Sequence, residues 1–245
     1  MSDEAEPCVR LAWDSAFFGI GIARVCGRTL DEARAARVDA WCRRERVACV
    51  YFLAPADDPA TTRCAEQHGF SLVDVRVELE RKLEAGAEAA VRAAVADDVP
   101  VLESIARGSY TASRFYADGH FPRAQCDALY ARWVRESFHG FADAVLVTPQ
   151  KGAPAAFVTC QLEAGERAER VGRIGLLGVD PRQRGKGLGQ CVVHAAAAWC
   201  AGRGAQRVQV VTQGRNIASQ RLYQRCGFLT RGIGLYYHKW WSIDR

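Results

Sequence analysis

The sequence predicts an α/β protein built from two parts. Segments in which apolar and polar residues alternate, as in strands, are interleaved with segments whose apolar residues recur at helical spacing. At 245 residues the chain is longer than the usual domain of about 100–150 residues. Two short landmarks also occur in both halves of the chain with the same spacing between them.

Composition excludes several classes of protein. Hydrophobic residues make up 49% and charged residues 25% of the chain, which is typical of a folded globular protein. No apolar run approaches the roughly 20 residues that span a bilayer. The acidic residues 1–7 differ from the basic start of a secretory leader. We therefore expect a cytoplasmic protein without membrane insertion.

The cysteines and histidines do not form a recognisable metal or disulfide pattern. The ten cysteines include no Cys-x-x-Cys pair, and the five histidines are scattered along the chain. We expect reduced, mostly buried thiols and no metal site.

The first part of the chain ends in a strand and a linker. Residues 71–80 alternate apolar and polar side chains, which predicts a strand. The polar residues 80–88 separate two patterned regions, and we place a linker there. This boundary gives an N-terminal domain of residues 1–85 and a C-terminal domain of residues 86–245.

The second part alternates strands with helices. Asp97 and Asp98 can cap a helix that carries Leu102 and Ile105 at helical spacing, and Pro122 can begin a second helix. Strands are expected at residues 91–95, 144–148, 155–162 and 173–179, of which the middle two form an antiparallel pair.

The two halves look like distant copies of one unit. An Ala-Trp-Cys triplet ends at Cys42 and again at Cys200, and a Gly-Phe pair ends at Phe70 and again at Phe228. A β-rich run lies between the two landmarks in each half. A duplicated helix–strand–helix–strand unit explains this pattern. The first copy is degenerate, because residues 26–31 have no glycine-rich turn.

A basic, glycine-rich loop carries the main functional signal. The residues from Arg173 to Arg231 contain ten Lys or Arg and one acid, Asp180, an excess of about +9. Such an excess indicates either an anionic ligand or a solvated basic face. Within it, residues 179–189 connect the strand at 173–179 to a helix with Val192 and Trp199 on its inward side.

A loop of this kind is suited to phosphate. The N–H groups at a helix N-terminus lack intrahelical partners, and glycines let a phosphate approach the backbone. The run lacks the Ser or Thr that follows lysine in nucleoside-triphosphate loops. It also departs from the Gly-x-Gly-x-x-Gly pattern of dinucleotide folds.

The pattern that fits is Arg184-x-x-Gly187-x-Gly189. It resembles the pyrophosphate loop of the GNAT acetyltransferase superfamily, and the resemblance covers about residues 90–245. Within that superfamily the chain is similar to the dTDP-fucosamine acetyltransferases, in segments that lie in both halves of the chain. These segments are residues 11–19, 113–116, 121–122, 210–228 and 236–240.

The resemblance implies a fold, a co-substrate and a set of binding residues. The fold is the α/β GNAT acyl-CoA N-acyltransferase fold, a mixed central sheet flanked by helices, with a degenerate partial GNAT-like N-terminal domain. The co-substrate is acetyl-CoA. Gly178 suits a strand bulge beside it, and the alternative is that this glycine simply relieves packing. The residues expected to contact acetyl-CoA are Leu177, Val179, Gln183, Arg184, Gly185, Lys186, Gly187, Leu188, Gly189 and Asn216.

The resemblance implies that Tyr223 is the catalytic acid. Asn216 can cap a helix that Gly227 ends, with Ala218, Leu222 and Cys226 on its buried stripe. Tyr223 lies seven residues after Asn216 and therefore on the same face. A phenol is protonated at neutral pH and can donate a proton to a thiolate, whereas the structural alternative is a core aromatic residue.

The acceptor is expected to be the amine of a nucleotide-linked amino sugar used for cell-surface polysaccharide, with dTDP-4-amino-4,6-dideoxy-D-galactose as the first candidate. Arg114, Phe115 and His238 are the expected acceptor-binding residues, and Arg123 is a further candidate for acceptor phosphates. The general base is left open between His238, Glu163 and water. The alternatives are a GNAT enzyme that acetylates another small amine or a peptide, and a non-enzymatic acetyl-CoA sensor. No nucleic-acid partner is expected, and a homodimer is one option for assembly.

Overall fold

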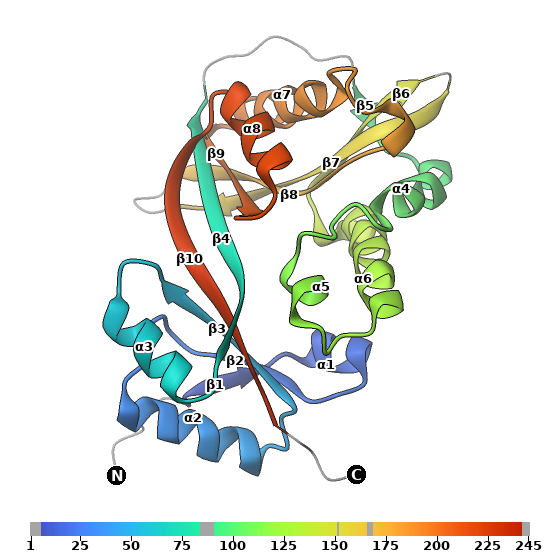
Figure 1. Cartoon of the computed structure of the whole chain (residues 1–245). Helices are drawn as coiled ribbons and strands as arrows, with labels where there is room; N and C mark the ends of the chain where they lie inside the picture. Colours follow the sequence, from blue (N-terminus) through green and yellow to red (C-terminus); the bar gives the residue numbers. More distant parts are fainter. Residues whose placement is uncertain (1–5, 84–90, 151, 166–168, 242–245) are drawn as a thin grey trace. The chain divides into compact units, whose positions relative to one another are not determined.

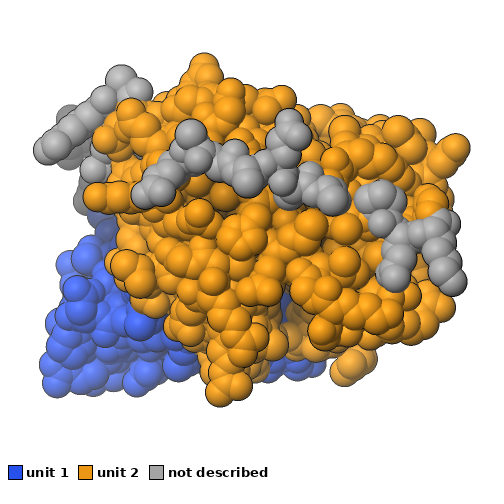
Figure 2. Space-filling model, turned by 90° about the horizontal axis from the view of Figure 1, so that it is seen from above, with its two compact units in different colours: residues 1–76, 113–121, 233–245 blue, residues 77–112, 122–232 orange. Residues whose placement is uncertain are grey.

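The computed structural model describes residues 6–83, 91–150, 152–165 and 169–241. The chain divides into two compact units, which Figure 2 shows in different colours. Unit 1 contains residues 1–76, 113–121 and 233–245, and unit 2 contains residues 77–112 and 122–232. The expected boundary at residue 85 lies among residues 84–90, outside the described part. The start of the predicted linker, residues 80–82, is the end of a strand.

Unit 1 contains most of the N-terminal elements and two segments from later in the chain (Figure 1). Its neighbouring strands follow the order β1-β2-β3-β10, in which β2 and β3 are parallel and the other pairs are antiparallel. Its elements are β1 (Cys8–Arg10), α1 (Ala12–Phe18), β2 (Ile22–Val25), α2 (Glu32–Arg44), β3 (Cys49–Pro55), α3 (Pro59–Gln67), the start of β4 (Ser71–Lys82), α5 (Arg114–Asp118) and the end of β10 (Leu229–Trp240).

The core of unit 1 is formed by apolar residues of α2, α3 and the strands. Asp31 begins α2, because its side chain accepts a hydrogen bond of 2.8 Å from the Arg34 N–H. Trp41 of α2 is buried in the same cluster as Phe52, Phe70 and Tyr237.

Unit 2 is a mixed sheet with helices. Its strand order is β4-β9-β8-β7-β6-β5, in which β8 and β9 are parallel and the pairs from β8 to β5 are antiparallel. Its elements are the end of β4, β5 (Arg92–Ala93), α4 (Val99–Ala106), α6 (Arg123–Glu136), β6 (Ala144–Gln150), β7 (Ala153–Ala164), β8 (Arg170–Val179), α7 (Leu188–Ala201), β9 (Ala205–Gln213), α8 (Ile217–Arg225) and the start of β10.

The expected elements of unit 2 are confirmed, with small shifts at their ends. Asp98 accepts a hydrogen bond of 2.8 Å from the Val95 N–H and closes a single 3-10 turn ahead of α4. Arg92 donates two hydrogen bonds to the same carboxylate, which holds the pKa of Asp98 below its ordinary value. In α7, Val192 is buried as predicted, whereas Trp199 is only half-buried, with the Arg203 guanidinium over its ring.

The helix–strand–helix–strand order predicted from the repeated landmarks occurs in both units. In unit 1 it is α2-β3-α3-β4, and in unit 2 it is α7-β9-α8-β10. Each copy contains a glycine with positive φ after its second helix, +76° at Gly69 and +81° at Gly227. The loop before the first helix differs between the copies. A side-chain cap from Asp31 precedes α2, whereas a glycine-rich turn precedes α7.

The prediction for the cysteines is confirmed. All ten are free thiols, and eight of them are buried. Among the described residues, no helix is long and apolar enough to cross a bilayer.

Candidate functional site

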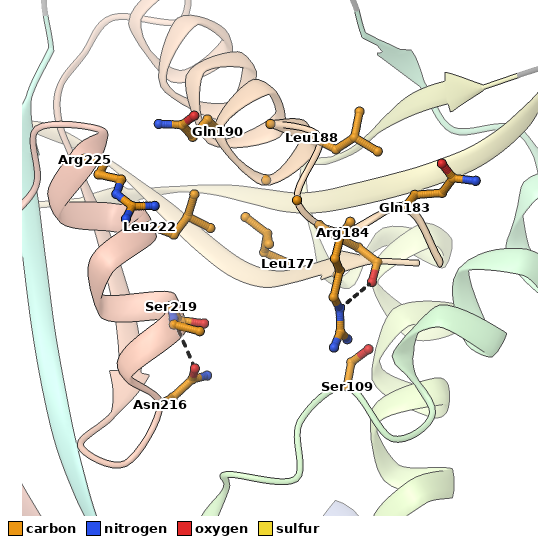
Figure 3. A pocket seen from close by; sticks show the side chains of 16 residues that line it. Ser109, Leu177, Gln183, Arg184, Leu188, Gln190, Asn216, Ser219, Leu222 and Arg225 are labelled. Carbon is orange, nitrogen blue, oxygen red and sulfur yellow. Dashed lines mark hydrogen bonds between the residues drawn. The ribbon is translucent and has the colours of Figure 1, made fainter. Parts of the chain in front are cut away.

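Unit 2 contains a cavity of about 450 Å³ between the end of β8, the glycine-rich loop and α8 (Figure 3). Of the residues expected to contact acetyl-CoA, all but Lys186 line it. These lining residues are Leu177, Val179, Gln183, Arg184, Gly185, Gly187, Leu188, Gly189 and Asn216.

The cavity is present because two parallel strands separate. Strand β8 pairs with β9 from Arg170 only as far as Ile174, which lies opposite Val210. Beyond that point β8 continues to Val179 and stays paired with β7. The backbone groups of this last stretch that face away from β7 are therefore available to a ligand.

The register shows which backbone groups those are. The Asp180 N–H donates a hydrogen bond of 2.9 Å to the Ala155 carbonyl, and hydrogen-bonded pairs alternate along an antiparallel ladder. Leu177 and Val179 thus direct their N–H and C=O groups away from β7. The carbonyl of Leu177 already accepts a hydrogen bond of 3.0 Å from the Tyr110 hydroxyl.

A bulge is present in β8, but Gly178 is not part of it. Gly175 and Leu176 together lie opposite Thr159, and the Leu176 N–H donates to the Thr159 hydroxyl at 2.8 Å. Gly178 lies opposite Phe157, and a Cβ added to Gly178 would lie 2.4 Å from the Phe157 ring. The bulge prediction for Gly178 was therefore wrong. The alternative, that a glycine relieves packing at this position, agrees with the structure.

The loop presents backbone N–H groups to the cavity. Gly185 and Gly187 have φ of +79° and +78°, a conformation that favours glycine, and the space beside each is open for at least 4 Å. The first intrahelical bond of α7 runs from the Cys191 N–H to the Gly187 carbonyl. The N–H groups of the residues between them have no intrahelical partner, so the positive end of the helix faces the cavity.

The basic side chains of the loop differ in their positions. Arg184 lines the cavity, and its Nε donates a hydrogen bond of 3.4 Å to the Val179 carbonyl (Figure 3). Lys186 is exposed, and its Nζ donates to the Gln183 side chain at 2.8 Å. Arg182 is paired with Asp180, at 3.1 Å. Arg184 is thus the loop cation available to a ligand in the cavity.

Helix α8 forms the opposite wall. The Asn216 side chain accepts a hydrogen bond of 3.1 Å from the Ser219 N–H, as a helix cap does, and both residues line the cavity (Figure 3). Ala218 and Leu222 also line it, so the prediction of a buried stripe was wrong for these two residues, whereas Cys226 is buried as predicted. In a single sequence, an apolar cavity wall and an apolar core face have the same pattern.

Tyr223 lies on the buried side of α8. It is 5% exposed, packs against Phe228 and is not among the residues that line the cavity. Burial raises the pKa of its phenol above the ordinary value, so the hydroxyl is protonated at neutral pH. Tyr223 also contributes to raising the pKa of Tyr110, which places the two phenols near each other. Sequence reasoning missed Tyr110, which no motif marks.

Unit 1 brings together the three residues expected to bind the acceptor. The Arg114 guanidinium lies over the rings of Tyr51 and Phe115, at 4.2 and 4.4 Å from the ring centres. Its Nη1 is 3.4 Å from Nε2 of His238. The His238 ring is buried and stacks on Tyr51, with 4.5 Å between ring centres.

Asp118 holds these side chains in place, and its role was not predicted from the sequence. Its carboxylate bonds to Nδ1 of His238 and accepts further hydrogen bonds from Trp240 Nε1 at 3.1 Å and from the His120 ring at 2.6 Å. Arg114 and Asp118 are four residues apart on α5, a spacing that places them on the same helix face. That spacing was the available signal.

The other residues considered for the site, Glu163 and Arg123, do not line the cavity beside the glycine-rich loop. Glu163 is partly exposed, pairs with Arg173 and lines a different cavity of unit 2. Arg123 begins α6 in unit 2, whereas Arg114 belongs to unit 1. One group with metal-ligand chemistry occurs among the described residues, formed by Glu32, Cys64 and His68 of unit 1. Its Glu32 and His68 side chains are hydrogen-bonded to each other at 2.7 Å.

Comparison with known proteins shows the family. The model of the Acetyltransferase (GNAT) family matches residues 106–228, which is half of the chain. The chain belongs to this family. It is an acetyl-CoA-dependent N-acetyltransferase.

Among curated proteins, this GNAT enzyme is 29% identical to the dTDP-fucosamine acetyltransferase of Escherichia coli O6:H1 strain CFT073. That alignment covers 89% of this chain and 91% of the relative. The enzyme is also 27% identical to the spore coat polysaccharide biosynthesis protein SpsD of Bacillus subtilis strain 168, over 58% of this chain and 48% of that protein.

The fold matches solved structures of GNAT proteins. The crystal structure of a GCN5-related N-acetyltransferase from Sphaerobacter thermophilus has a TM-score of 0.66 to this enzyme. The match covers 97% of this chain and 78% of that one, at 16% identity. The expected GNAT fold, with its mixed sheet and flanking helices, is confirmed.

Proposed function

We propose that this enzyme acetylates the amine of a nucleotide-linked amino sugar for cell-surface polysaccharide. The first candidate acceptor is dTDP-4-amino-4,6-dideoxy-D-galactose, and the reaction would take place in the cytoplasm. The observation that carries this proposal is the alignment with dTDP-fucosamine acetyltransferase, which spans 91% of that relative. The similarity to a polysaccharide biosynthesis protein supports the same pathway class.

The cavity of unit 2 fits acetyl-CoA, which supplies an acetyl group as a thioester. The unpaired N–H groups at the start of α7 and the Arg184 guanidinium suit its pyrophosphate. The outward-facing N–H groups of Leu177 and Val179 suit the amide carbonyls of its extended arm, because strand edges recognise extended amide chains. The open space at Gly185 and Gly187 leaves room for phosphate oxygens.

Acetyl transfer forms a bond from the amine nitrogen to the carbonyl carbon and breaks the bond from that carbon to sulfur. The leaving thiolate then needs a proton, which we assign to the Tyr223 hydroxyl. Its raised pKa keeps the proton on the phenol throughout the neutral range. The neighbouring Tyr110 holds the Leu177 carbonyl and so fixes the backbone beside the reaction.

The residues around Arg114 are our proposal for recognition of the acceptor. Among the described residues, no carboxylate lies within 4 Å of the Arg114 guanidinium, so its charge is available to acceptor phosphate. The Tyr51 hydroxyl is buried and has no hydrogen-bond partner in the described part of the chain. Arg114 also lies over the Phe115 ring, whose face fixes the guanidinium plane.

His238 fits a positioning role better than a base. Burial lowers its pKa to about 4, so it is neutral at pH 7 and a weak acceptor for an ammonium proton. With Nδ1 bonded to Asp118, its Nε2 can accept a hydrogen bond from Arg114. We therefore assign proton removal from the amine to water.

A panel of acceptors tests the proposal. The enzyme is incubated with acetyl-CoA and dTDP-linked amino sugars, free amino sugars or peptides, and the products are analysed by mass spectrometry. We expect the mass of one acetyl group to be added to the nucleotide sugars. Acetylation confined to peptides or simple amines would support the alternative GNAT acceptors and contradict the proposal. No acetylation of any amine, despite CoA binding, would favour a sensor.

A further inference from the structure

The cavity of unit 2 is lined by a second arginine that the loop motif does not account for. Arg225 is the last residue of α8 and lines the cavity, as does Gln190 of α7 (Figure 3). In the same view the loop cation Arg184 lies on the opposite side of the cavity from Arg225. The cavity therefore has two separate cationic positions.

Packing between the two helices fixes the position of Arg225. A Cβ on Gly189 would lie 3.2 Å from a methyl group of Leu222, so the first turn of α7 lies directly against α8 at that residue. Arg225 follows Leu222 by three residues and thus lies on the same face of α8, one turn further on. Its side chain therefore lines the cavity on the α8 wall, across from Arg184 (Figure 3).

Arg225 is not needed for the structure of α8. An arginine at a helix C-terminus commonly binds the last carbonyl groups. Here Arg81 has that role, because its Nη1 donates a hydrogen bond of 2.9 Å to the Cys226 carbonyl. Among the described residues, no carboxylate lies within 4 Å of Arg225. An exposed, unneutralised arginine in a phosphate-binding cavity indicates an anionic ligand group.

We propose that Arg225 binds the 3′-phosphate of coenzyme A, while the α7 N-terminus and Arg184 bind its pyrophosphate. Coenzyme A carries these two phosphate groups on either side of its ribose, which matches the two cationic positions. The inference rests on the acetyl-CoA cavity and not on the identity of the acceptor. It can therefore be tested without any acceptor.

Calorimetric titration with coenzyme A and with 3′-dephospho-coenzyme A tests the assignment. The wild-type enzyme should bind coenzyme A about five- to tenfold more tightly than the dephospho form, the size expected for one partly solvated charged hydrogen bond. Arg225→Gln should remove this preference by weakening coenzyme A alone. Arg225→Lys should retain most of it, because the charge is kept. Arg184→Gln should weaken both ligands alike.

Arg221→Gln is the matched control, since Arg221 is exposed on the same helix and does not line the cavity. It should leave both affinities unchanged. Equal weakening of both ligands by Arg225→Gln would place Arg225 on the pyrophosphate and overturn the proposal. No effect on either ligand, or the same effect from Arg221→Gln, would also overturn it. The wild-type comparison needs no variant, and equal affinity for the two ligands would contradict the proposal on its own.

Discussion

The Tyr110 hydroxyl donates a hydrogen bond of 3.0 Å to the carbonyl oxygen of Leu177. Leu177 lies in the stretch of β8 that has left β9, so the hydroxyl replaces a hydrogen bond that the sheet no longer supplies. The Tyr110 ring is held by stacking on Tyr130, with 4.3 Å between ring centres. This contact fixes the stretch of β8 that, in the proposed binding mode, lies beside the thioester.

Replacing Tyr110 by Phe should lower kcat/KM for acetyl-CoA by about three- to tenfold, the usual size of one lost hydrogen bond. The ring and its stacking remain, so the melting temperature should change little. Tyr110→Leu also removes the stacking and should lower the melting temperature as well. Steady-state kinetics and thermal unfolding check both variants. An unchanged kcat/KM in Tyr110→Phe would contradict a role for this hydrogen bond.

Replacing Tyr223 by Phe should lower kcat by about 100-fold or more, because general-acid catalysis contributes at least that much. The affinity for coenzyme A should stay within about twofold of wild type, because Tyr223 does not line the cavity. Burial raises the pKa of the phenol, so its deprotonation should not reduce wild-type kcat between pH 7 and pH 9. Rates measured against pH, with titration of coenzyme A, check these points. A kcat equal to wild type would remove Tyr223 as the acid.

Replacing Gly178 by Ala should destabilise the protein by about 1–3 kcal/mol, the usual cost of overpacking. The added methyl group would lie 2.4 Å from the Phe157 ring. Gly202→Ala is the control, because Gly202 has helical φ and ψ and an added Cβ there would make only ordinary contacts. That variant should be neutral or slightly stabilising. Denaturant unfolding distinguishes them, and equal stability of the two variants would contradict the packing role of Gly178.

The burial of His238 predicts a pH dependence of stability. Its pKa is lowered by burial to about 4, so below its unfolded pKa the unfolded chain binds more protons than the folded one. The contribution of neutral His238 to the free energy of unfolding should therefore be complete above about pH 6.5. The free energy of unfolding should fall by up to about 3 kcal/mol as the pH drops toward 4. The charged or titratable groups around the ring are Arg114, Asp118 and His120, and Asp118 stays ionised through most of this window because its own pKa is lowered.

Chemical unfolding from pH 7 to pH 4 measures this effect, with His238→Asn as the variant that removes the titrating group. The slope should be shallower in His238→Asn than in wild type. His139→Gln, at an exposed histidine of unit 2, should keep the wild-type slope. A wild-type slope retained in His238→Asn would assign the acid sensitivity to other groups.

The local elements and the loop could be predicted from the sequence because their signals are local. Helix caps at Asn216 and positive-φ glycines such as Gly187 act within a few residues. The face assignments on α8 could not be predicted. Leu222 faces a cavity and Tyr223 faces the interior, yet both are large residues at amphipathic spacing.

Contacts between residues far apart in the sequence could not be predicted from the sequence pattern either. Asp118 bonds to His238 across 120 residues of chain. In the sequence, Asp118 is an ordinary acidic residue and His238 is a single histidine next to aromatic residues, so neither indicates the other as its partner. Similarly, the opening of β8 from β9 depends on where two strands stop pairing, which the composition of either strand does not encode.

The nature of the acceptor decides between the proposed function and its alternatives. It is tested by comparing kcat/KM for dTDP-4-amino-4,6-dideoxy-D-galactose with that for the same amino sugar without the nucleotide, by following the release of coenzyme A. We expect a preference of at least about 100-fold for the nucleotide sugar, which recognition of its phosphates would supply, and we expect Arg114→Gln to remove most of it. Equal kcat/KM for the two sugars would show that the enzyme does not recognise the nucleotide.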